Sequence, residues 1–102
     1  MAQLVVLYKA PADPAAFDDH YFNKHVPLAK KIPGLRRYEV STGPVASPAG
    51  PTGLHLVAIL HFDSLADIAA AFASPQGQAA GADVPTFASG GADMLMFDTR
   101  EV

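Results

Sequence analysis

Two short runs of the chain are apolar at nearly every position and indicate strands that are buried on both faces. These runs are Gln3 to Lys9 and Leu54 to Phe62, and both are rich in valine, leucine or isoleucine. Short length and β-branched side chains favour strands over helices, and a strand that is apolar on both faces needs cover on both sides. Ala92 to Thr99 is predicted as the last strand. Leu35 to Thr42 alternates and is more polar, which is typical of an edge strand.

The stretch from Asp13 to Gly34 has the period of an amphipathic helix. Asp13 and Pro14 form a start signal, because the carboxylate accepts from free first-turn N–H groups and proline lacks an N–H there. Pro33 and Gly34 end the predicted helix. Its inward stripe recurs at steps of three and four residues, and consists of Phe17, Tyr21, His25, Leu28 and Ile32.

Pro27 lies inside this predicted helix and is expected to distort it. Proline cannot donate to the carbonyl of Asn23 and clashes with it, at a cost of about 3 kcal/mol. We therefore expect a kink or bulge just before Pro27, beside His25. The alternative is a purely structural bend that wraps the helix around the sheet.

The middle and end of the chain add a loop and two further helical segments. Gly43 to Gly53 is crowded with proline and glycine and is predicted to be a flexible surface loop. Ser64 and Ser74 are predicted helix N-caps, and the second of these helices is expected to run to about Asp83. Val84 to Gly91 is then a connection.

The predicted elements have the order β-α-β-β-α-β. Right-handed crossovers give this pattern a ferredoxin-like α+β fold, with an antiparallel sheet in the order 4-1-3-2 and helices on one face. We expect a single domain over residues 1–102. The uncovered sheet face would be a large apolar patch for a monomer. The sequence therefore predicts a homodimer whose sheets pack face to face as a dimeric α+β barrel.

The composition of the chain excludes cysteine-based sites and argues against nucleic-acid and membrane partners. The chain has no cysteine, which excludes disulfides, a thiolate nucleophile and cysteine-based metal sites. Its net charge of −3 provides no attraction to nucleic acid. No apolar run approaches the ~18 residues of a membrane span, and we expect no secretory signal. We also expect no nucleic-acid or membrane partner and a cytoplasmic location.

His25 is the first candidate for chemistry, because it is the one histidine on the core-facing stripe. Near neutral pH a histidine there can act as acid, base or hydrogen-bond donor. The alternative is a core histidine satisfied by a backbone carbonyl. Asp83, at the end of the last helical segment, is a candidate to reach His25 and orient it as a dyad partner. Its alternative is a surface acid ahead of a proline turn.

The other three histidines are assigned to no site. His20 lies about 140° from His25 on an ideal helix and is predicted to face solvent. His55 and His61 are expected on one face of a strand, about 20 Å apart, which is too far to share a metal. No histidine pair has the i, i+4 spacing of a helical zinc site, and no phosphate or dinucleotide motif is present. We predict no metal and no organic cofactor.

The helix sequence FDDHYFNKHVPLAKKIPGLRRY resembles the signature of the EthD family, in the dimeric α+β barrel superfamily. The matching positions are Phe17, Tyr21, His25, Pro27-Leu28-Ala29, Pro33-Gly34-Leu35 and Tyr38. Ser74-Pro75, Gln78 and Asp83 to Phe87 are also similar. The resemblance implies a ferredoxin-like protomer, a dimer built through the sheets, and a pocket between sheet and helices that His25 faces. It implies that the pocket is walled by Tyr8, Tyr21, Phe72 and Phe87.

The resemblance also implies a range of functions. The family is associated with ether degradation and with enzymes that act on polyketide aromatics, and the superfamily includes cofactor-free monooxygenases, isomerases and haem enzymes. One hypothesis is cofactor-free acid–base chemistry by His25 on a small apolar or aromatic substrate, as an oxidoreductase, isomerase or lyase. The other is a non-catalytic binding or accessory protein of an oxygenase system. Haem binding through His25 is disfavoured, because the chain is short for a haem pocket.

Overall fold

Four strands form one antiparallel sheet in the computed structural model, which describes residues 1–102. Their spatial order is β2 (Arg37–Val40), β5 (Leu54–Phe62), β1 (Ala2–Lys9) and β6 (Ala92–Asp98). The two most apolar strands, β1 and β5, are therefore central, and the polar strand β2 lies at an edge. When β5 and β6 are counted as the third and fourth strands and the sheet is followed from β6 to β2, this is the predicted order 4-1-3-2. The ferredoxin-like α+β fold is confirmed.

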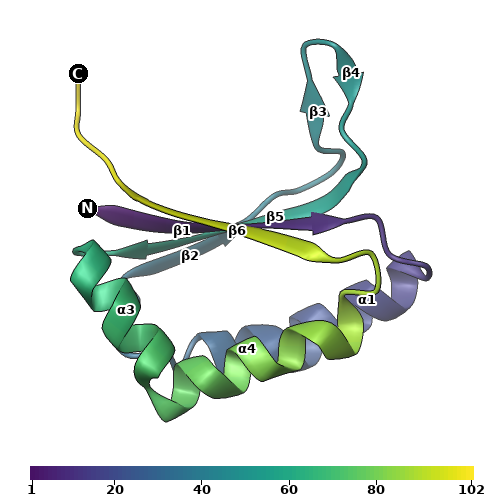
Figure 1. Ribbon diagram of the computed structural model, residues 1–102. Helices are drawn as coiled ribbons and strands as arrows, with labels where there is room; N and C mark the ends of the chain where they lie inside the picture. Colours follow the sequence, from purple (N-terminus) through teal and green to yellow (C-terminus); the bar gives the residue numbers. More distant parts are fainter.

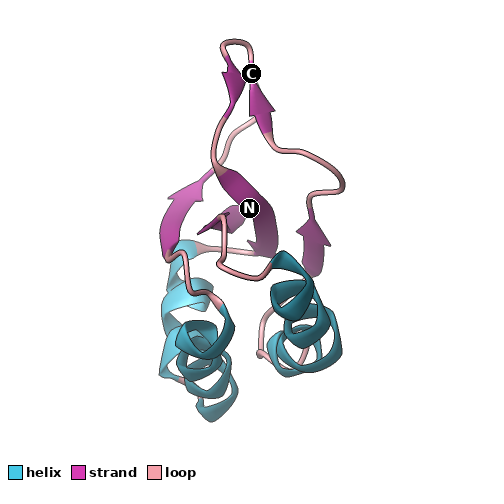
Figure 2. Cartoon of the chain, turned by 90° about the vertical axis from the view of Figure 1, so that its right-hand side faces the viewer, coloured by secondary structure: helices cyan, strands magenta, loops and turns pink.

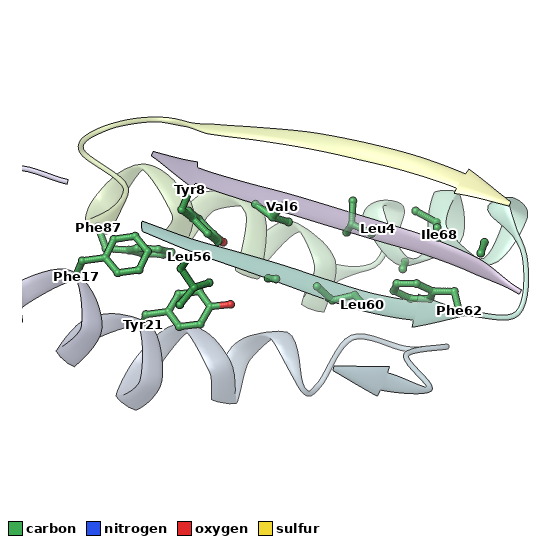
Figure 3. Packing of buried hydrophobic residues seen from close by; sticks show 13 residues of the cluster. Leu4, Val6, Tyr8, Phe17, Tyr21, Leu56, Leu60, Phe62, Ile68 and Phe87 are labelled. Carbon is green, nitrogen blue, oxygen red and sulfur yellow. The ribbon is translucent and has the colours of Figure 1, made fainter. Parts of the chain in front are cut away.

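All the helices lie on one side of the sheet (Figures 1 and 2). α1 (Pro14–His20), the π-helix η1 (Tyr21–His25) and α2 (Val26–Ala29) follow one another directly, and α3 (Leu65–Ala73) is followed by α4 (Pro75–Phe87). None of these helices has the length and apolar character needed to cross a membrane. The core lies between the two layers (Figure 3), and its largest fully buried side chains are Tyr8, Phe17, Tyr21, Phe62 and Ile68.

The first helix changes its winding just before Pro27, as predicted. The N–H of Val26 donates to the carbonyl of Tyr21, five residues back instead of four. Such an i→i+5 bond defines a π-turn, and Pro27 follows it at the start of α2, where a missing N–H is least costly. The bulge expected beside His25 is therefore present as η1.

The ends of this helix are set by ordinary capping. Its start agrees with the prediction, because the Asp13 carboxylate accepts from the N–H of Ala16 at 3.1 Å. It ends at Ala29, earlier than predicted. The N–H groups of Lys31 and Ile32 donate to carbonyls only three residues back, so the chain tightens into turns before it reaches Pro33.

The last helix is longer than predicted. α4 continues through Pro85 to Phe87, where the sequence indicated a connection from Val84 onward. Pro85 removes one helical hydrogen bond. The gain that offsets this loss is packing, because the buried ring of Phe87 lies 5.6 Å from that of Tyr8 and 5.1 Å from that of Phe17.

The predicted flexible loop from Gly43 to Gly53 contains a β-hairpin. β3 (Ala46–Ser47) pairs antiparallel with β4 (Gly50–Pro51). Gly50 and Gly53 have φ values of +123° and +76°, which glycine adopts without a Cβ clash. The hairpin projects from the sheet on the side away from the helices (Figure 1).

The side of the sheet opposite the helices carries a continuous apolar surface, which we call the outer face. The strand register places Val5 between Ile59 and Leu95, and Leu95 is 52% exposed. A sheet face of this character supports the prediction that two protomers pack through their sheets. Its apolar members are Val5, Leu7, Val57, Ile59, Leu95 and Phe97.

Candidate functional site

His25 and Asp83 lie in contact between the first helix and α4. His25 is 5% exposed, and its Nδ1 atom lies 3.0 Å from Oδ2 of Asp83. An ionised carboxylate accepts from Nδ1–H and so fixes the imidazole tautomer. The other ring nitrogen, Nε2, is then left as an acceptor that can take up a proton.

His20 binds the same carboxylate, although its position in the sequence predicted a solvent-facing side chain. Its Nε2 lies 2.9 Å from Oδ1 and 3.0 Å from Oδ2 of Asp83. On a regular α-helix residues five apart diverge, but a π-turn brings them one turn apart on the same face. The predicted solvent-facing position of His20 is wrong, because its side chain turns to Asp83 and is only 24% exposed. One sequence feature could have indicated this contact: the two histidines are five residues apart, just before Pro27, where a bulge in the helix was expected.

Two neighbouring residues of α4 hold this group, which we call the histidine–aspartate cluster (His20, His25 and Asp83). The hydroxyl of Thr86 lies 2.5 Å from the carbonyl oxygen of Asp83 and 3.2 Å from its Oδ1, and it can donate to either oxygen. The ring of Phe87 stacks on His20 at a centroid distance of 5.1 Å and lies 4.8 Å from the ring of His25. Phe87 therefore restricts both imidazoles through one packed ring.

Burial and the shared carboxylate set the charge states of the cluster. Burial lowers the pKa of His25, and the hydrogen bond to Asp83 opposes only part of this effect. Burial alone would raise the pKa of Asp83, but hydrogen bonds from His20 and His25 outweigh it and bring the pKa below its usual value. Near neutral pH, Asp83 is therefore ionised and His25 neutral, which is the form a general base requires.

The lowered pKa of His25 predicts a loss of stability in mild acid. A histidine whose pKa falls on folding binds more protons in the unfolded chain, so the free energy of unfolding decreases as the pH drops below about 6.5. The contribution of Asp83 is lost separately, below its unfolded pKa of about 3.9. Urea titrations from pH 7.5 to 5 should show a steeper decline for the wild type than for His25→Asn. Equal slopes would contradict a neutral, buried His25.

A cavity of about 50 Å³ lies between the sheet and the helices beside His25. Fifteen of its 18 lining residues are hydrophobic, so an apolar molecule is favoured there. Phe72 and Met94 belong to the lining and are 39% and 45% exposed, which marks the side on which the cavity opens. A benzene ring fits a cavity of about 150 Å³. An aromatic ligand would therefore displace these two side chains, and methionine adapts readily to such a change.

The aromatic residues expected at a pocket occupy two positions relative to this cavity. Tyr8 and Phe72 are on its wall, together with Tyr38. Tyr21 and Phe87, which were also expected to wall the pocket, are not among the residues that line it. The Tyr21 hydroxyl is 2.5 Å from that of Tyr38 and fixes it. Burial raises the pKa of both Tyr8 and Tyr21, so both hydroxyls are neutral near pH 7.

α4 contributes small residues to the cavity wall, including Gly77 and Gly81. Packing requires the first of these, because a Cβ at Gly77 would lie 1.8 Å from the carbonyl oxygen of Ala71. A Cβ at Gly81 would meet no atom within 4 Å, so packing does not require glycine there. Glycine in a helix costs about 1 kcal/mol relative to alanine. At Gly81 its structural effect is to leave space at the cavity wall.

His55 and His61 take no part in the site. A register shift near the end of β1 turns His55 toward α1, where its Nε2 lies 2.8 Å from Asp18. His61 instead pairs with Glu39 of β2 at 2.7 Å. The prediction that the two share one face is therefore wrong. No three histidine, aspartate or glutamate side chains are grouped so that they could hold a metal ion.

The sheet order, the one-sided helical layer and the apolar cavity between the two layers define a ferredoxin-like α+β protein. The model of the EthD domain matches residues 9–91. The chain therefore belongs to the EthD family.

This chain is similar to other proteins both in sequence and in structure. An uncharacterized 11.0 kDa protein of the thcB–thcC intergenic region of Rhodococcus erythropolis is 48% identical, over 100% of this chain and 98% of that protein. An EthD family protein of Bacillus halodurans has a TM-score of 0.88 and 36% identity, over 98% of this chain and 99% of that one. SnoaB of Streptomyces nogalater, a cofactor-independent oxygenase, shares the fold with a TM-score of 0.68 and 16% identity, over 99% and 94%. Two further structures of this fold, at most 20% identical, are described as dimeric.

Proposed function

We propose that this protein binds a small apolar or aromatic ligand in the cavity and moves a proton on it with His25, without a metal or organic cofactor. One observation carries this proposal. The imidazole of His25 is held at Nδ1 by Asp83 while the same residue forms part of an otherwise apolar cavity wall. A ring fixed in this way offers Nε2 to a bound ligand as a general base.

The neighbouring residues have supporting roles in this proposal. Asp83 orients His25 and stabilises the imidazolium that forms when Nε2 takes up a proton. His20 and Thr86 position the carboxylate of Asp83. Tyr8 lies on the cavity wall with a neutral hydroxyl, which can donate to an oxygen atom of the ligand.

Removal of a proton is the shared first step of cofactor-free oxygenation, isomerisation and elimination. It leaves a carbanion or an enolate, and an electron-rich species of this kind can react with oxygen, be reprotonated elsewhere or expel a leaving group. Support for an oxygenase comes from SnoaB, which has this fold and is described as cofactor-independent. The proposed enzyme class is therefore an oxidoreductase, isomerase or lyase.

A second candidate function is a carrier that delivers an apolar ligand to an oxygenase partner. The open side of the cavity at Phe72 and Met94 favours this function, because catalysis by a fixed base benefits from the exclusion of water. In a carrier, His25 would supply one orienting hydrogen bond in an apolar pocket.

Deuterium exchange distinguishes the proposed enzyme from the proposed carrier. It detects removal of a proton from the ligand, so the final product need not be known. A panel of small aromatic ketones and lactones is incubated with the protein in D₂O, in air and with a chelator present. We expect ligands that bind to acquire deuterium at their acidic carbon, or to be converted, as followed by mass spectrometry. A ligand that binds tightly but shows neither exchange nor conversion would identify a carrier and contradict the enzymatic proposal.

A further inference from the structure

The β3–β4 hairpin has almost no packing within its own protomer. Its two strands pair with each other, and its residues are exposed except for the half-buried Val45 and Gly50. Its tie to the body is at its root, where the N–H of Ala10 donates to the carbonyl of Gly53 at 3.0 Å. An isolated two-stranded hairpin is only marginally stable in water. A hairpin this short is therefore expected to rest on another surface.

The hairpin stands at one end of the outer face, and the C-terminal segment stands at the other. Both project to the side of the sheet opposite the helices (Figure 1), and the tip of the hairpin and the C-terminus rise to similar heights (Figure 2). The apolar side chains of the outer face lie between these two projections. The outer face is therefore bounded by the hairpin at one end and by the C-terminal segment at the other, and we call the apolar surface between them the floor.

The hairpin is long enough to pass a second sheet laid on this floor. Thr42 to Ser47 spans five residue steps, which at about 3.3 Å each extend up to about 16 Å. Two sheets packed face to face lie about 10 Å apart. The tip would therefore extend past the plane of the second sheet and lie against its flank.

We propose that the β3–β4 hairpin is a clasp that holds a second copy of this chain across the outer face. A second copy fits because a two-fold interface is self-complementary, so each protomer offers one apolar floor and one hairpin. Charges at the edges of the face are already paired within the protomer, as in Lys9 with Asp93 and Arg37 with Glu39, and require no charged partner. The proposal extends the face-to-face dimer and does not depend on any catalytic role of His25.

Cross-linking from a single introduced cysteine tests the clasp directly, since the chain has no cysteine of its own. Ala49→Cys at the hairpin tip, labelled with a photoactivated cross-linker, should give a covalent dimer. The matched control is Ala79→Cys, at an exposed alanine of α4, which should give little. Equal yields from the two positions, or only intrachain products from the hairpin, would overturn the clasp.

A shortened hairpin provides an independent measurement. Replacing residues 45–51 by Asn-Gly should raise the dimer Kd at least tenfold in sedimentation experiments, because the deletion removes the contacts of the clasp, and a tenfold change in Kd corresponds to about 1.4 kcal/mol. Circular dichroism checks that the shortened chain is folded. Leu95→Glu, on the outer face, should dissociate the dimer whether or not the hairpin contributes. An unchanged Kd for the shortened chain, beside a dissociated Leu95→Glu variant, would overturn the clasp and leave the dimer intact.

Discussion

Replacing His25 by asparagine should lower turnover, or deuterium exchange into the ligand, by about 10²–10⁴-fold, which is the usual contribution of a general base. The amide of asparagine can still donate to Asp83, so the carboxylate is not left without this partner. The amide cannot take up a proton, however. The measurement is kcat and KM on a ligand that exchanges with the wild type, together with circular dichroism and sedimentation to show that the fold and the oligomeric state are unchanged.

Asp83→Asn should cause a loss of similar order, because an amide can stabilise the wrong tautomer of His25 and cannot stabilise the imidazolium. The matched control is Asp19→Asn, at an exposed acid of α1 that is bonded only to Asn23. This variant should keep wild-type turnover. Undiminished turnover in His25→Asn would show that His25 is not the base, whatever the behaviour of Asp83→Asn.

Phe87→Ala should lower the free energy of unfolding by about 3–5 kcal/mol, as is common for buried phenylalanine. The ring of Phe87 lies within 5.7 Å of the rings of Tyr8, Phe17 and Tyr21, and it also contacts both histidines of the cluster. A domain of this size has only about 5–15 kcal/mol of total stability. Urea titration at pH 7.5 measures the loss, and imidazole signals in NMR spectra should show that His20 and His25 become less restricted.

Phe22→Ala is the control for this packing argument. Phe22 is also aromatic and lies in η1, but about half of its surface is exposed. Its removal should change the unfolding free energy by less than about 1 kcal/mol. Equal losses from the two substitutions would mean that burial of Phe87 does not account for the length of α4.

The strand order and the distortion of the first helix could be predicted because both follow from local chemistry. Apolar runs such as Leu54–Phe62 need cover on both sides, which places them at the centre of a sheet. Pro27 lacks an N–H wherever it stands, so a bulge beside it follows from the residue alone. The contact between His25 and Asp83 was predicted from one helix stripe and one expected helix end, and it forms although α4 continues past Asp83 to Phe87.

The remaining features depend on contacts that no local pattern specifies. The position of His20 was missed because a helical wheel assumes 100° per residue throughout, whereas η1 winds more slowly. The extension of α4 to Phe87 depends on aromatic partners from β1 and α1. The hairpin within Gly43 to Gly53 was predicted as a loop because proline and glycine dominate its composition, and its short strands carry no alternating pattern.

The π-turn has a consequence for comparing this helix with those of other proteins. A π-turn is equivalent to an α-helical turn with one inserted residue. In a helix that lacks the insertion, histidines four apart would occupy the places that His20 and His25 hold here. An alignment must therefore open a one-residue gap inside Tyr21–His25. A gap placed elsewhere would match one of the two histidines to an unrelated position and hide the pair.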